Sequence, residues 1–362
     1  MGKQSTVPFG PQHPVLPEPV HLDLVMEDEK ILKAIPSIGF VHRGLESLIE
    51  KKDYQEMVYV VERTCGICSF MHGMGYCEAV EHIMNLEVPK RARFLRTIWC
   101  EMSRIHSHLL WLGLLADAFG FESLFYQAWR MREKILDCFE MTTGGRVIFS
   151  VNTIGGVLKD MEPDHIKAIL DAIEWIEGEL KVIRRTFLFD ATVETRLKGV
   201  GVLSKEEAHD LGCVGPFGRA SGLKVDTRKR GYAAYPEIDF EPVTSTVGDS
   251  FARCDVRINE VFQSIDIIRQ AVAKLPDEKD LNVPVKPVDT PLGEYFMRVE
   301  QPRGEACYYV KGNGTKLLDR LRIRTPTFAN IPGMLKTLEG ADYADVPILI
   351  LTIDPCISCT ER

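Results

Sequence analysis

The sequence has no excess of positive charge: its 52 acidic residues outnumber 44 Lys and Arg, which gives a net charge of −8. Without a basic surface to attract phosphates, nucleic acid is excluded as a partner. Long apolar runs are also lacking, since the longest two, residues 109–115 and 346–353, are far too short to span a bilayer. Residues 1–5 are polar and lead into a proline-rich stretch, which predicts that there is no secretory signal peptide.

Disulfides are not expected, although the chain has ten cysteines. A chain of 362 residues that is 45% hydrophobic can bury a large core and does not need covalent staples. We therefore expect a reducing compartment, where cysteines bind metals or lie buried as free thiols. Six cysteines have no paired spacing and are predicted to be small buried apolar residues: Cys77, Cys100, Cys138, Cys213, Cys254 and Cys307.

The pattern of apolar residues predicts an α+β fold, with a mainly helical body and a small N-terminal β-sheet. Alternation at 20–26 and 31–35, around a polar turn, indicates a two-stranded hairpin. After residue 45, apolar residues recur three and four positions apart, as in helices. The predicted helices cover 45–61, 69–84, 89–115, 124–141, 164–189 and 251–275, and a capping box at Ser204–Glu207 predicts another short helix.

We expect a single domain over 1–362. Residues 212–250 are rich in glycine and proline and are predicted to be a long loop that faces a ligand or partner. Two short strands are expected within 295–310, a brief helix at 335–338, and a buried strand or extended run at 347–353. The domain has four regions: an N-terminal sheet region (1–44), a helical core (45–211), the loop insertion (212–250), and a C-terminal helix with a metal-ligand segment (251–362).

Two C-x-x-C pairs stand near opposite ends of the chain, Cys65 with Cys68 and Cys356 with Cys359. This spacing lets two thiolates bind one metal centre, and the fold must bring the two ends together if all four bind the same centre. Four sulfur donors suit Zn, Ni, Fe or Cu rather than Mg or Ca. A closed structural zinc site is one interpretation. The long separation of the pairs and the titratable residues beside them favour a reactive site.

Two motifs resemble those of NiFe-hydrogenase large subunits. Residues 63–72 match R-x-C-G-x-C-x-x-x-H, and residues 354–362 match the closing D-P-C-x-x-C-x-x-H/R. Residues 10–14, 42–46 and 132–134 also resemble the catalytic-core subunit of respiratory complex I, which lacks the cysteine motifs. Similarity to both families, over most of the chain, points to the fold that they share and to the membrane-bound, energy-converting (Ech-like) hydrogenases.

The resemblance implies a NiFe centre held by the four cysteines. Cys65 and Cys356 would be terminal Ni ligands, while Cys68 and Cys359 would bridge Ni and an Fe that carries CO and cyanide. His72 would support a ligating sulfur through a hydrogen bond. Without the resemblance, His72 would be read as an ordinary buried histidine.

Four further residues receive roles from the resemblance. Glu18 would relay protons near a terminal cysteine, although its Pro-Glu-Pro context is also typical of a solvated turn. Arg303, in Pro302-Arg303-Gly304, would hang over the open metal position, and Asp354 could pair with it. Asp117 resembles an acid of the outer active-site canyon.

Glu46 matches a residue that binds a Mg or Fe ion beside the site in many relatives. There the other ligand is a C-terminal histidine, whereas Arg362 stands at that position here. Glu46 therefore has two interpretations: a ligand of this extra ion, or part of a proton-transfer or coupling network.

The implied reaction is the reversible formation and cleavage of H₂. Electrons would pass to ferredoxin through a small subunit with a 4Fe–4S cluster. Further iron–sulfur and integral membrane subunits would hold the chain on the cytoplasmic side of the membrane and couple the reaction to ion translocation. The alternative is a zinc-stapled, non-catalytic scaffold subunit of a complex I-like assembly. A quinone-site subunit is less favoured, because the cysteines would then have no purpose.

Overall fold

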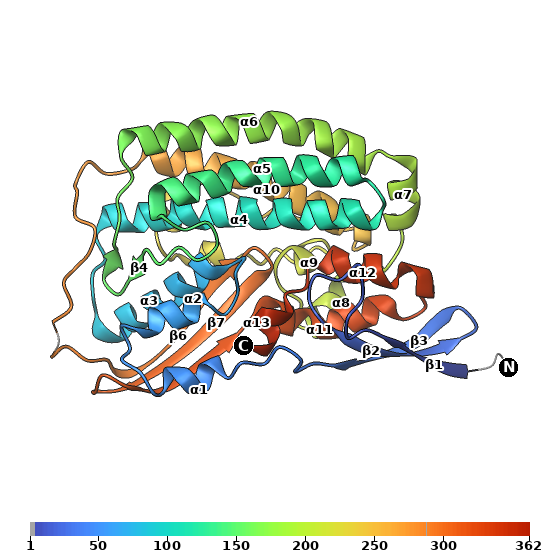
Figure 1. Cartoon of the computed structure of the whole chain (residues 1–362), viewed down its shortest axis with the longest axis horizontal. Coiled ribbons are helices and arrows are strands. Elements are labelled where there is room, and N and C mark those ends of the chain that lie inside the picture. The colour runs from blue at the N-terminus through green and yellow to red at the C-terminus, as the bar shows by residue number, and fades with distance from the viewer. Residues whose placement is uncertain (1–3, 287) are drawn as a thin grey trace.

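Four long helices form one layer of the molecule, at the top of Figure 1. They are α4 (Lys90–Ala118), α5 (Glu122–Thr143), α6 (Pro163–Leu188) and α10 (Ser250–Ala273). The computed structural model describes residues 4–286 and 288–362. Residues 1–3 and Pro287, which fall in the predicted N-terminal region and C-terminal region, lie outside the described residues.

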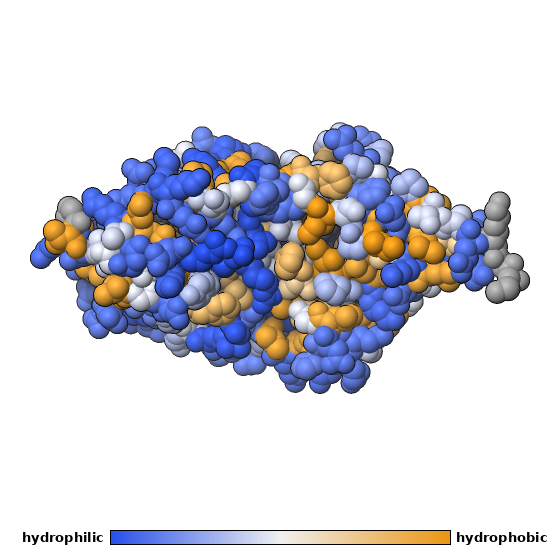
Figure 2. Space-filling model, turned by 90° about the horizontal axis from the view of Figure 1, so that it is seen from below, coloured by the Kyte–Doolittle hydropathy of each residue, from blue (hydrophilic) through white to orange (hydrophobic). Residues whose placement is uncertain are grey.

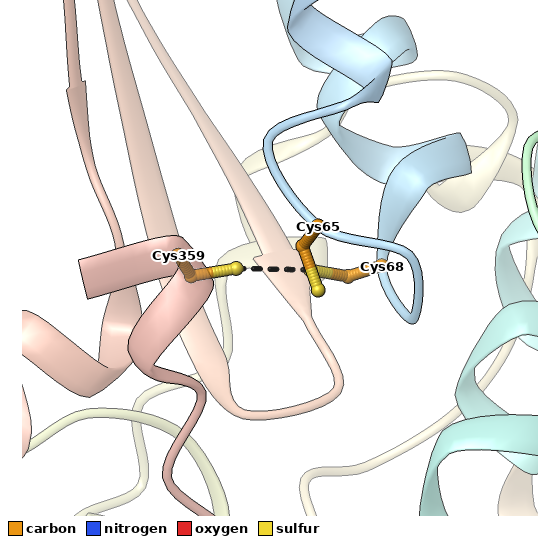
Figure 3. Close-up of side chains that lie close together, drawn as sticks. All are labelled: Cys65, Cys68 and Cys359. Carbon is orange, nitrogen blue, oxygen red and sulfur yellow. Dashed lines mark hydrogen bonds between the residues drawn. The ribbon is translucent and has the colours of Figure 1, made fainter. Parts of the chain in front are cut away.

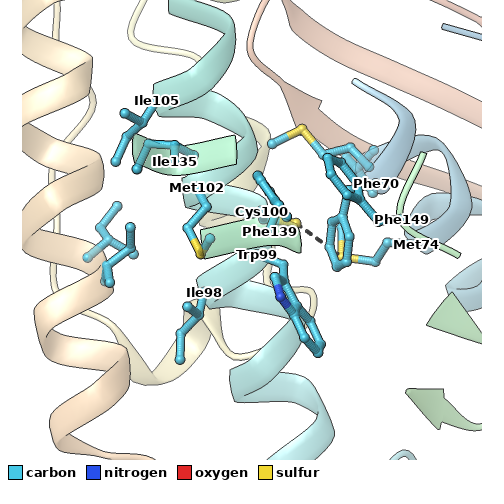
Figure 4. Packing of buried hydrophobic residues seen from close by; sticks show 14 of the residues in the cluster. Phe70, Met74, Ile98, Trp99, Cys100, Met102, Ile105, Ile135, Phe139 and Phe149 are labelled. Carbon is cyan, nitrogen blue, oxygen red and sulfur yellow. Dashed lines mark hydrogen bonds between the residues drawn. The ribbon is translucent and has the colours of Figure 1, made fainter. Parts of the chain in front are cut away.

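The helices pack through the apolar stripes that the sequence predicts. Apolar residues of α4 recur three and four positions apart, and the helix packs mainly against α5 and α10 and also contacts α3 (Ser69–Met84). Figure 4 shows this core: Trp99 and Cys100 of α4 lie on the side of Phe70 and Met74 of α3, whereas Ile98 points to the opposite side of α4. The predicted helix 69–84 coincides with α3.

A three-stranded antiparallel sheet packs below α3. Its strands are β6 (Leu292–Gln301), β7 (Gly304–Asn313) and β8 (Leu318–Arg324). Two short strands were predicted here. The observed strands β6 and β7 are longer, with ten residues each, and β8 was not predicted. The turn between β6 and β7 consists of Pro302 and Arg303, so the hairpin delivers Arg303 at its tip.

The predicted N-terminal sheet is confirmed, with β1 (Gln4–Phe9), β2 (His21–Glu27) and β3 (Lys30–Ser37) in sequential antiparallel order. Alternate residues of β2 are buried, because one face covers the C-terminal helices α11 (Pro326–Leu338) and α12 (Val346–Ile353). Helix α11 extends well beyond the predicted brief helix at 335–338.

The predicted strand or extended run at 347–353 is wrong, because this segment is helix α12. Its residues are buried on all sides, so the apolar run carries no period that distinguishes helix from strand. Pro347 near the start of the helix agrees with the preference of proline for the first helical turn.

The predicted long loop at 212–250 is irregular over most of its length but includes short helical turns. It contains α9 (Gly215–Arg219) and two 3₁₀ turns, η1 (Thr227–Arg230) and η2 (Tyr235–Glu237), and much of it is buried. Arg219 and Arg228 lie fully inside the protein, paired with buried carboxylates. Much of the segment therefore packs within the core, where Arg219 and Arg228 form their ion pairs.

The C-terminal residue lies in the middle of the molecule, beside α1 and α13 in Figure 1. The face seen from below combines a strongly hydrophilic zone with hydrophobic residues at one side (Figure 2). Within residues 4–286 and 288–362, no helix has the length and apolar character needed to cross a membrane. The remaining elements are α1 (Leu45–Ile49), α2 (Met57–Glu62), β4 (Asn152–Thr153), β5 (Gly156–Val157), α7 (Ala191–Leu197), α8 (Lys205–Asp210), which starts at the predicted capping box, η3 (Tyr343–Asp345) and α13 (Ile357–Glu361).

Candidate metal centre

The two cysteine pairs meet at one buried point. Cys65 and Cys68 lie in the loop between α2 and α3, and Cys356 and Cys359 lie at the start of and within α13. The Cys65 and Cys356 sulfurs are 3.4 Å apart, as are those of Cys68 and Cys359. The sulfurs of Cys65, Cys68 and Cys359 lie within 4.8 Å of one another. Figure 3 shows these three side chains pointing toward one another. The fold thus brings two segments that are far apart in sequence, around residues 65 and 356, into one cysteine cluster.

The cluster has the donors and the charge that suit a bound metal. Hydrogen bonds from neighbouring thiols hold the pKa of Cys65 well below its usual range, and the Arg303 cation adds to this effect. Burial raises the pKa of Cys359 well above its usual value, and its contacts with the other sulfurs add to the rise. A soft or borderline cation such as Ni, Fe or Zn would bind these sulfurs as thiolates and release their protons.

Arg303 extends from the tip of the β6–β7 hairpin to the cluster. Its Nε donates to the backbone oxygen of Asp354 at 2.8 Å, and its Nη2 donates to Asp354 Oδ1 at 2.7 Å. Its Nη1 lies 3.4 Å from Ser107 Oγ of α4. Burial alone would lower the pKa of Arg303, but Asp354 and the cysteine sulfurs outweigh burial and keep the guanidinium charged. The expected pair of Arg303 with Asp354 is therefore present, two residues before Cys356.

His72 contacts the cluster from α3. Its Nε2 is 3.4 Å from Cys359 Sγ, and its Nδ1 is 2.8 Å from Tyr308 Oη. Burial lowers the pKa of His72 to about 4, so the ring is neutral at pH 7. Gln301 donates its side-chain N–H to Tyr308 Oη at 3.1 Å. The ring of His72 is thus held between Tyr308 and Cys359, and with a proton on Nε2 it would donate a hydrogen bond to a Cys359 thiolate.

The backbone of the first cysteine pair is fixed from α4. His106 Nε2 lies 3.0 Å from the carbonyl oxygen of Ile67, which stands between Cys65 and Cys68. Arg132 Nε donates to His106 Nδ1 at 3.1 Å, so the other ring nitrogen carries the proton that Ile67 accepts. Burial lowers the pKa of His106 to about 3 and keeps the ring neutral.

The second pair is fixed by Glu18, which is half-buried in the segment before β2. Its carboxylate accepts hydrogen bonds from the Ile357 N–H, the Ser358 N–H and the Ser358 hydroxyl. Both residues stand between Cys356 and Cys359. The structure therefore brings Glu18 to the cysteine cluster rather than leaving it in open solvent.

Arg43 links the two cysteine segments directly. It donates to the carbonyl oxygens of Arg63 and Thr64, just before Cys65, and to that of Ser358. A single guanidinium thus holds the loop after α2 against α13.

A buried ion network anchors the end of β6 just before Arg303. Arg104 of α4 donates to the carbonyl oxygens of Glu300 and Gln301 at 2.8 and 3.1 Å. Arg219 binds Glu300 and Glu260, each at 2.7 Å. Removing one member would leave a buried charge without its partner, which is strongly destabilising. The network therefore fixes where the hairpin tip lies.

Glu46 does not fit the expected Mg or Fe ion. Its Oε1 accepts from the Ile323 N–H at 2.9 Å and from Arg362 Nε at 3.0 Å, and its Oε2 accepts from Arg322 Nη1 at 2.7 Å. Burial opposes its charge, but the Ile323 N–H and the two guanidiniums outweigh burial and lower the pKa of Glu46. Two fixed positive charges beside this carboxylate disfavour a third. The surroundings of Glu46 therefore do not favour an extra Mg or Fe ion.

Asp117 is not brought to the cluster. It is exposed near the C-terminal end of α4, ten residues beyond Ser107, which corresponds to about 15 Å along a helix. The six unpaired cysteines are buried, as predicted. Cys100 contacts Met74, for example, and Cys213 lies against Gly333.

Sequence reasoning missed three contributors to the site: Arg43, His106 and Tyr308. Arg43 lies in the 42–46 motif, but the motif did not indicate what this residue does. His106 is one of two histidines at 106 and 108 on the buried helix α4, where it resembles an ordinary core histidine. Tyr308 belongs to no motif, and its contact with His72 depends on how β7 packs on α3.

Family models match nearly the whole chain from residue 43 onward. The nickel-dependent hydrogenase model matches residues 43–117. The model of the 49 kDa subunit of respiratory-chain NADH dehydrogenase matches residues 118–287 and 279–362.

Curated relatives and a solved structure agree with these models. The membrane-bound hydrogenase subunit alpha of Pyrococcus furiosus is 38% identical over 98% of this chain and 87% of its own length. The carbon monoxide-induced hydrogenase of Rhodospirillum rubrum is 37% identical over 99% of both. An NADH-quinone oxidoreductase subunit of Chloroherpeton thalassium is 34% identical over 98% of this chain and 86% of its own length.

The solved structure is a chain of an archaeal membrane-bound sulfane sulfur reductase. It superposes with a TM-score of 0.94 at 32% identity, covering 99% of this chain and 98% of that chain. The match confirms the predicted fold, a mainly helical body with small sheets. The chain therefore belongs to the family that unites the large subunits of membrane-bound hydrogenases with the 49 kDa subunit of respiratory NADH dehydrogenase.

Proposed function

We propose that the chain is the catalytic subunit of a membrane-associated NiFe hydrogenase. The observation that carries this proposal is that four cysteine sulfurs, the Arg303 guanidinium and the His72 ring come together at one buried point. A closed structural zinc site needs only the sulfurs. A charged guanidinium also lies beside the sulfurs, paired with Asp354. Such a group can stabilise negative charge that develops during a reaction, which favours a catalytic site.

The cysteines divide into two sets in a way that supports the proposed ligand roles. The first members of the pairs, Cys65 and Cys356, face each other, and so do the second members, Cys68 and Cys359. The first set would bind Ni, and the second set would bridge Ni and an Fe with CO and cyanide ligands. When bound, this centre would supply the two-electron cleavage and formation of the H–H bond.

The residues around the cysteine cluster would bind protons and orient the sulfur ligands. Glu18 contacts the backbone between Cys356 and Cys359 and can hold a proton at its carboxylate. Arg303 would stabilise negative charge at the sulfurs, and Asp354 keeps the guanidinium oriented. His72 would direct one N–H at Cys359 and so limit its basicity.

The proposal includes partner subunits. The matched relatives are named as a membrane-bound hydrogenase subunit and a respiratory quinone oxidoreductase subunit. We propose that electrons pass between this chain and ferredoxin through a small subunit with a 4Fe–4S cluster. Further iron–sulfur and membrane subunits would hold it at the cytoplasmic side of the membrane and couple the reaction to ion translocation.

Elemental analysis with infrared spectroscopy of the purified complex tests the proposal. Ni and Fe in equal amounts, with infrared bands of bound CO and cyanide, are expected. Zn as the bound metal would instead establish the scaffold alternative. Cys68→Ser and Cys359→Ser should each abolish hydrogen uptake and the Fe signal, because a neutral hydroxyl is a poor ligand for soft metals. Near-normal uptake in either variant would refute the ligand assignment.

A further inference from the structure

The last three residues are held by the loop before α1. The Glu361 carboxylate accepts the N–H groups of Gly39 at 2.6 Å and Val41 at 2.5 Å. His42 Nδ1 donates to the backbone oxygen of Glu361 at 2.6 Å. Glu361 is therefore occupied by neutral donors of residues 39–42 and leaves the charge of Arg362 to be balanced by another acid.

Arg362 finds that acid in Glu46. Its Nε donates to Glu46 Oε1 at 3.0 Å, its Nη1 donates to the Thr360 carbonyl oxygen at 2.8 Å, and its guanidinium stacks 5.6 Å from the Phe328 ring centroid. The side chains of Arg362 and Glu46 are 17% and 14% exposed, so water screens this pair only in part. The planar guanidinium is thus fixed on three sides.

The groups that face Glu46 leave no free negative charge for a metal ion. They are the guanidiniums of Arg362 and Arg322 and the N–H of Ile323. A divalent cation at this carboxylate would sit among two fixed positive charges, and at least one arginine would have to leave. A pocket lined by Glu46, Arg322 and Arg362 keeps the position within reach of ions in solution.

We propose that Arg362 replaces a divalent cation at the Glu46 site, with Arg322 as the second positive charge there. The Arg362 guanidinium takes the place that a divalent ion would occupy, and it positions the segment that carries Cys359, three residues earlier. The stability of the chain is then independent of cations that prefer oxygen ligands, such as Mg²⁺ and Mn²⁺. This inference concerns how the segment is held and does not depend on the proposed NiFe centre.

Thermal unfolding of the purified full chain, titrated with Mn²⁺, tests the inference. Mn²⁺ prefers carboxylate oxygens to thiolates, so the state of the cysteine cluster does not enter the measurement. The melting temperature of the native chain should not change with Mn²⁺. Arg362→Met should melt about 2–4 °C lower, because Glu46 loses one of its two cations, and Mn²⁺ should restore part of the loss by binding Glu46.

Two further variants provide an independent test and a control. Arg362→His should lower the melting temperature and respond to Mn²⁺ more strongly than Arg362→Met, because imidazole can act as a ligand beside Glu46. Arg320→Met is the matched control: Arg320 lies on the same strand β8 and pairs with Glu50, away from Arg362. Its melting temperature should not depend on Mn²⁺.

Three outcomes would overturn the inference. They are a rise in the melting temperature of the native chain with Mn²⁺, an unchanged melting temperature in Arg362→Met, and the absence of any Mn²⁺ response in Arg362→His. If Arg362→Met does not fold, the native titration and Arg362→His still decide the question. A chain that holds Zn instead of Ni and Fe would refute the proposed function and leave this result unaffected.

Discussion

The guanidinium of Arg303 is buried beside four sulfurs, with its charge balanced by Asp354. We expect Arg303→Lys to lower hydrogen turnover at least about tenfold, a loss of about 1.4 kcal/mol of transition-state stabilisation, while Ni and Fe contents stay normal. The lysine ammonium keeps the charge, but it cannot reach Asp354 and Ser107 with the same planar fork. Turnover assays with metal analysis check this. Unchanged turnover would make Arg303 a structural residue.

Glu62, three residues before Cys65, gives a prediction about pH. It is fully buried, accepts hydrogen bonds from Ser150, and packs against Gly73. Burial raises the pKa of Glu62 from 4.5 to about 7. The folded chain thus binds a proton that the unfolded chain releases above pH 4.5, so this group's contribution to stability falls as pH rises to about 7 and is constant above that.

Glu62→Gln should therefore be more stable than the native chain above pH 7, by on the order of 3 kcal/mol at most, and equally stable near pH 4. Urea unfolding between pH 4 and 8 measures the difference. Glu56→Gln changes an exposed glutamate next to the same helix, α2, and should leave the pH dependence unaltered. A difference between native chain and Glu62→Gln that does not vary with pH would contradict the burial argument.

At the scale of elements, the β6–β7 hairpin depends on a close contact of two glycines. Gly304 has φ +129°, and a Cβ at this position would stand 2.7 Å from the Gly215 nitrogen at the start of α9. A side chain would push the hairpin tip, and Arg303 with it, away from the cysteine cluster. We expect Gly304→Ala to lower the free energy of unfolding by on the order of 1–3 kcal/mol and to reduce turnover.

Gly293 separates backbone strain from the contact with Gly215. It lies in the same sheet with φ +118° and has no atom within 4 Å of an added Cβ. Gly293→Ala should therefore show only the cost of the backbone conformation and keep normal turnover. Equal turnover in the two variants would show that the position of the hairpin tip does not depend on Gly304.

Elements with a clear period were predictable from sequence, and the failures have specific causes. Helix α3 was placed at its observed bounds because its apolar residues follow a helical spacing. Strand β8 was missed because a register shift opposite Lys311 and Gly312 breaks its alternation, so that Leu318, Leu321 and Ile323 are the buried residues. Helix α12 was missed because it is apolar on all sides.

The candidate site was predictable to the extent that it lies in motifs. The two cysteine pairs, His72, Arg303 and Glu18 could be named from local sequence, and the structure brings them together. The burial of Arg219 and Arg228 was not predicted, because Glu260 and Glu101, which pair with them, are distant in sequence; only Asp226, a second partner of Arg228, is close. The use of Arg362 as the partner of Glu46 was likewise invisible until both ends of the chain met.

For the whole molecule, the cysteine cluster is the point at which the segment before α3 meets the C-terminal segment. A metal that binds Cys65, Cys68, Cys356 and Cys359 stabilises the folded state, because the unfolded chain holds these ligands far apart. Removal of the metal should therefore lower the melting temperature. It should also increase hydrogen exchange in both cysteine segments together, residues 63–68 and 354–362.

Hydrogen exchange followed by mass spectrometry, before and after chelation, measures this coupling. Helix α6, on the far side of the helical layer in Figure 1, provides the internal control and should exchange at the same rate in both states. Faster exchange in residues 354–362 alone would mean that the C-terminal pair leaves without loosening the first. That result would contradict a shared centre, because a metal held by both pairs must protect both segments.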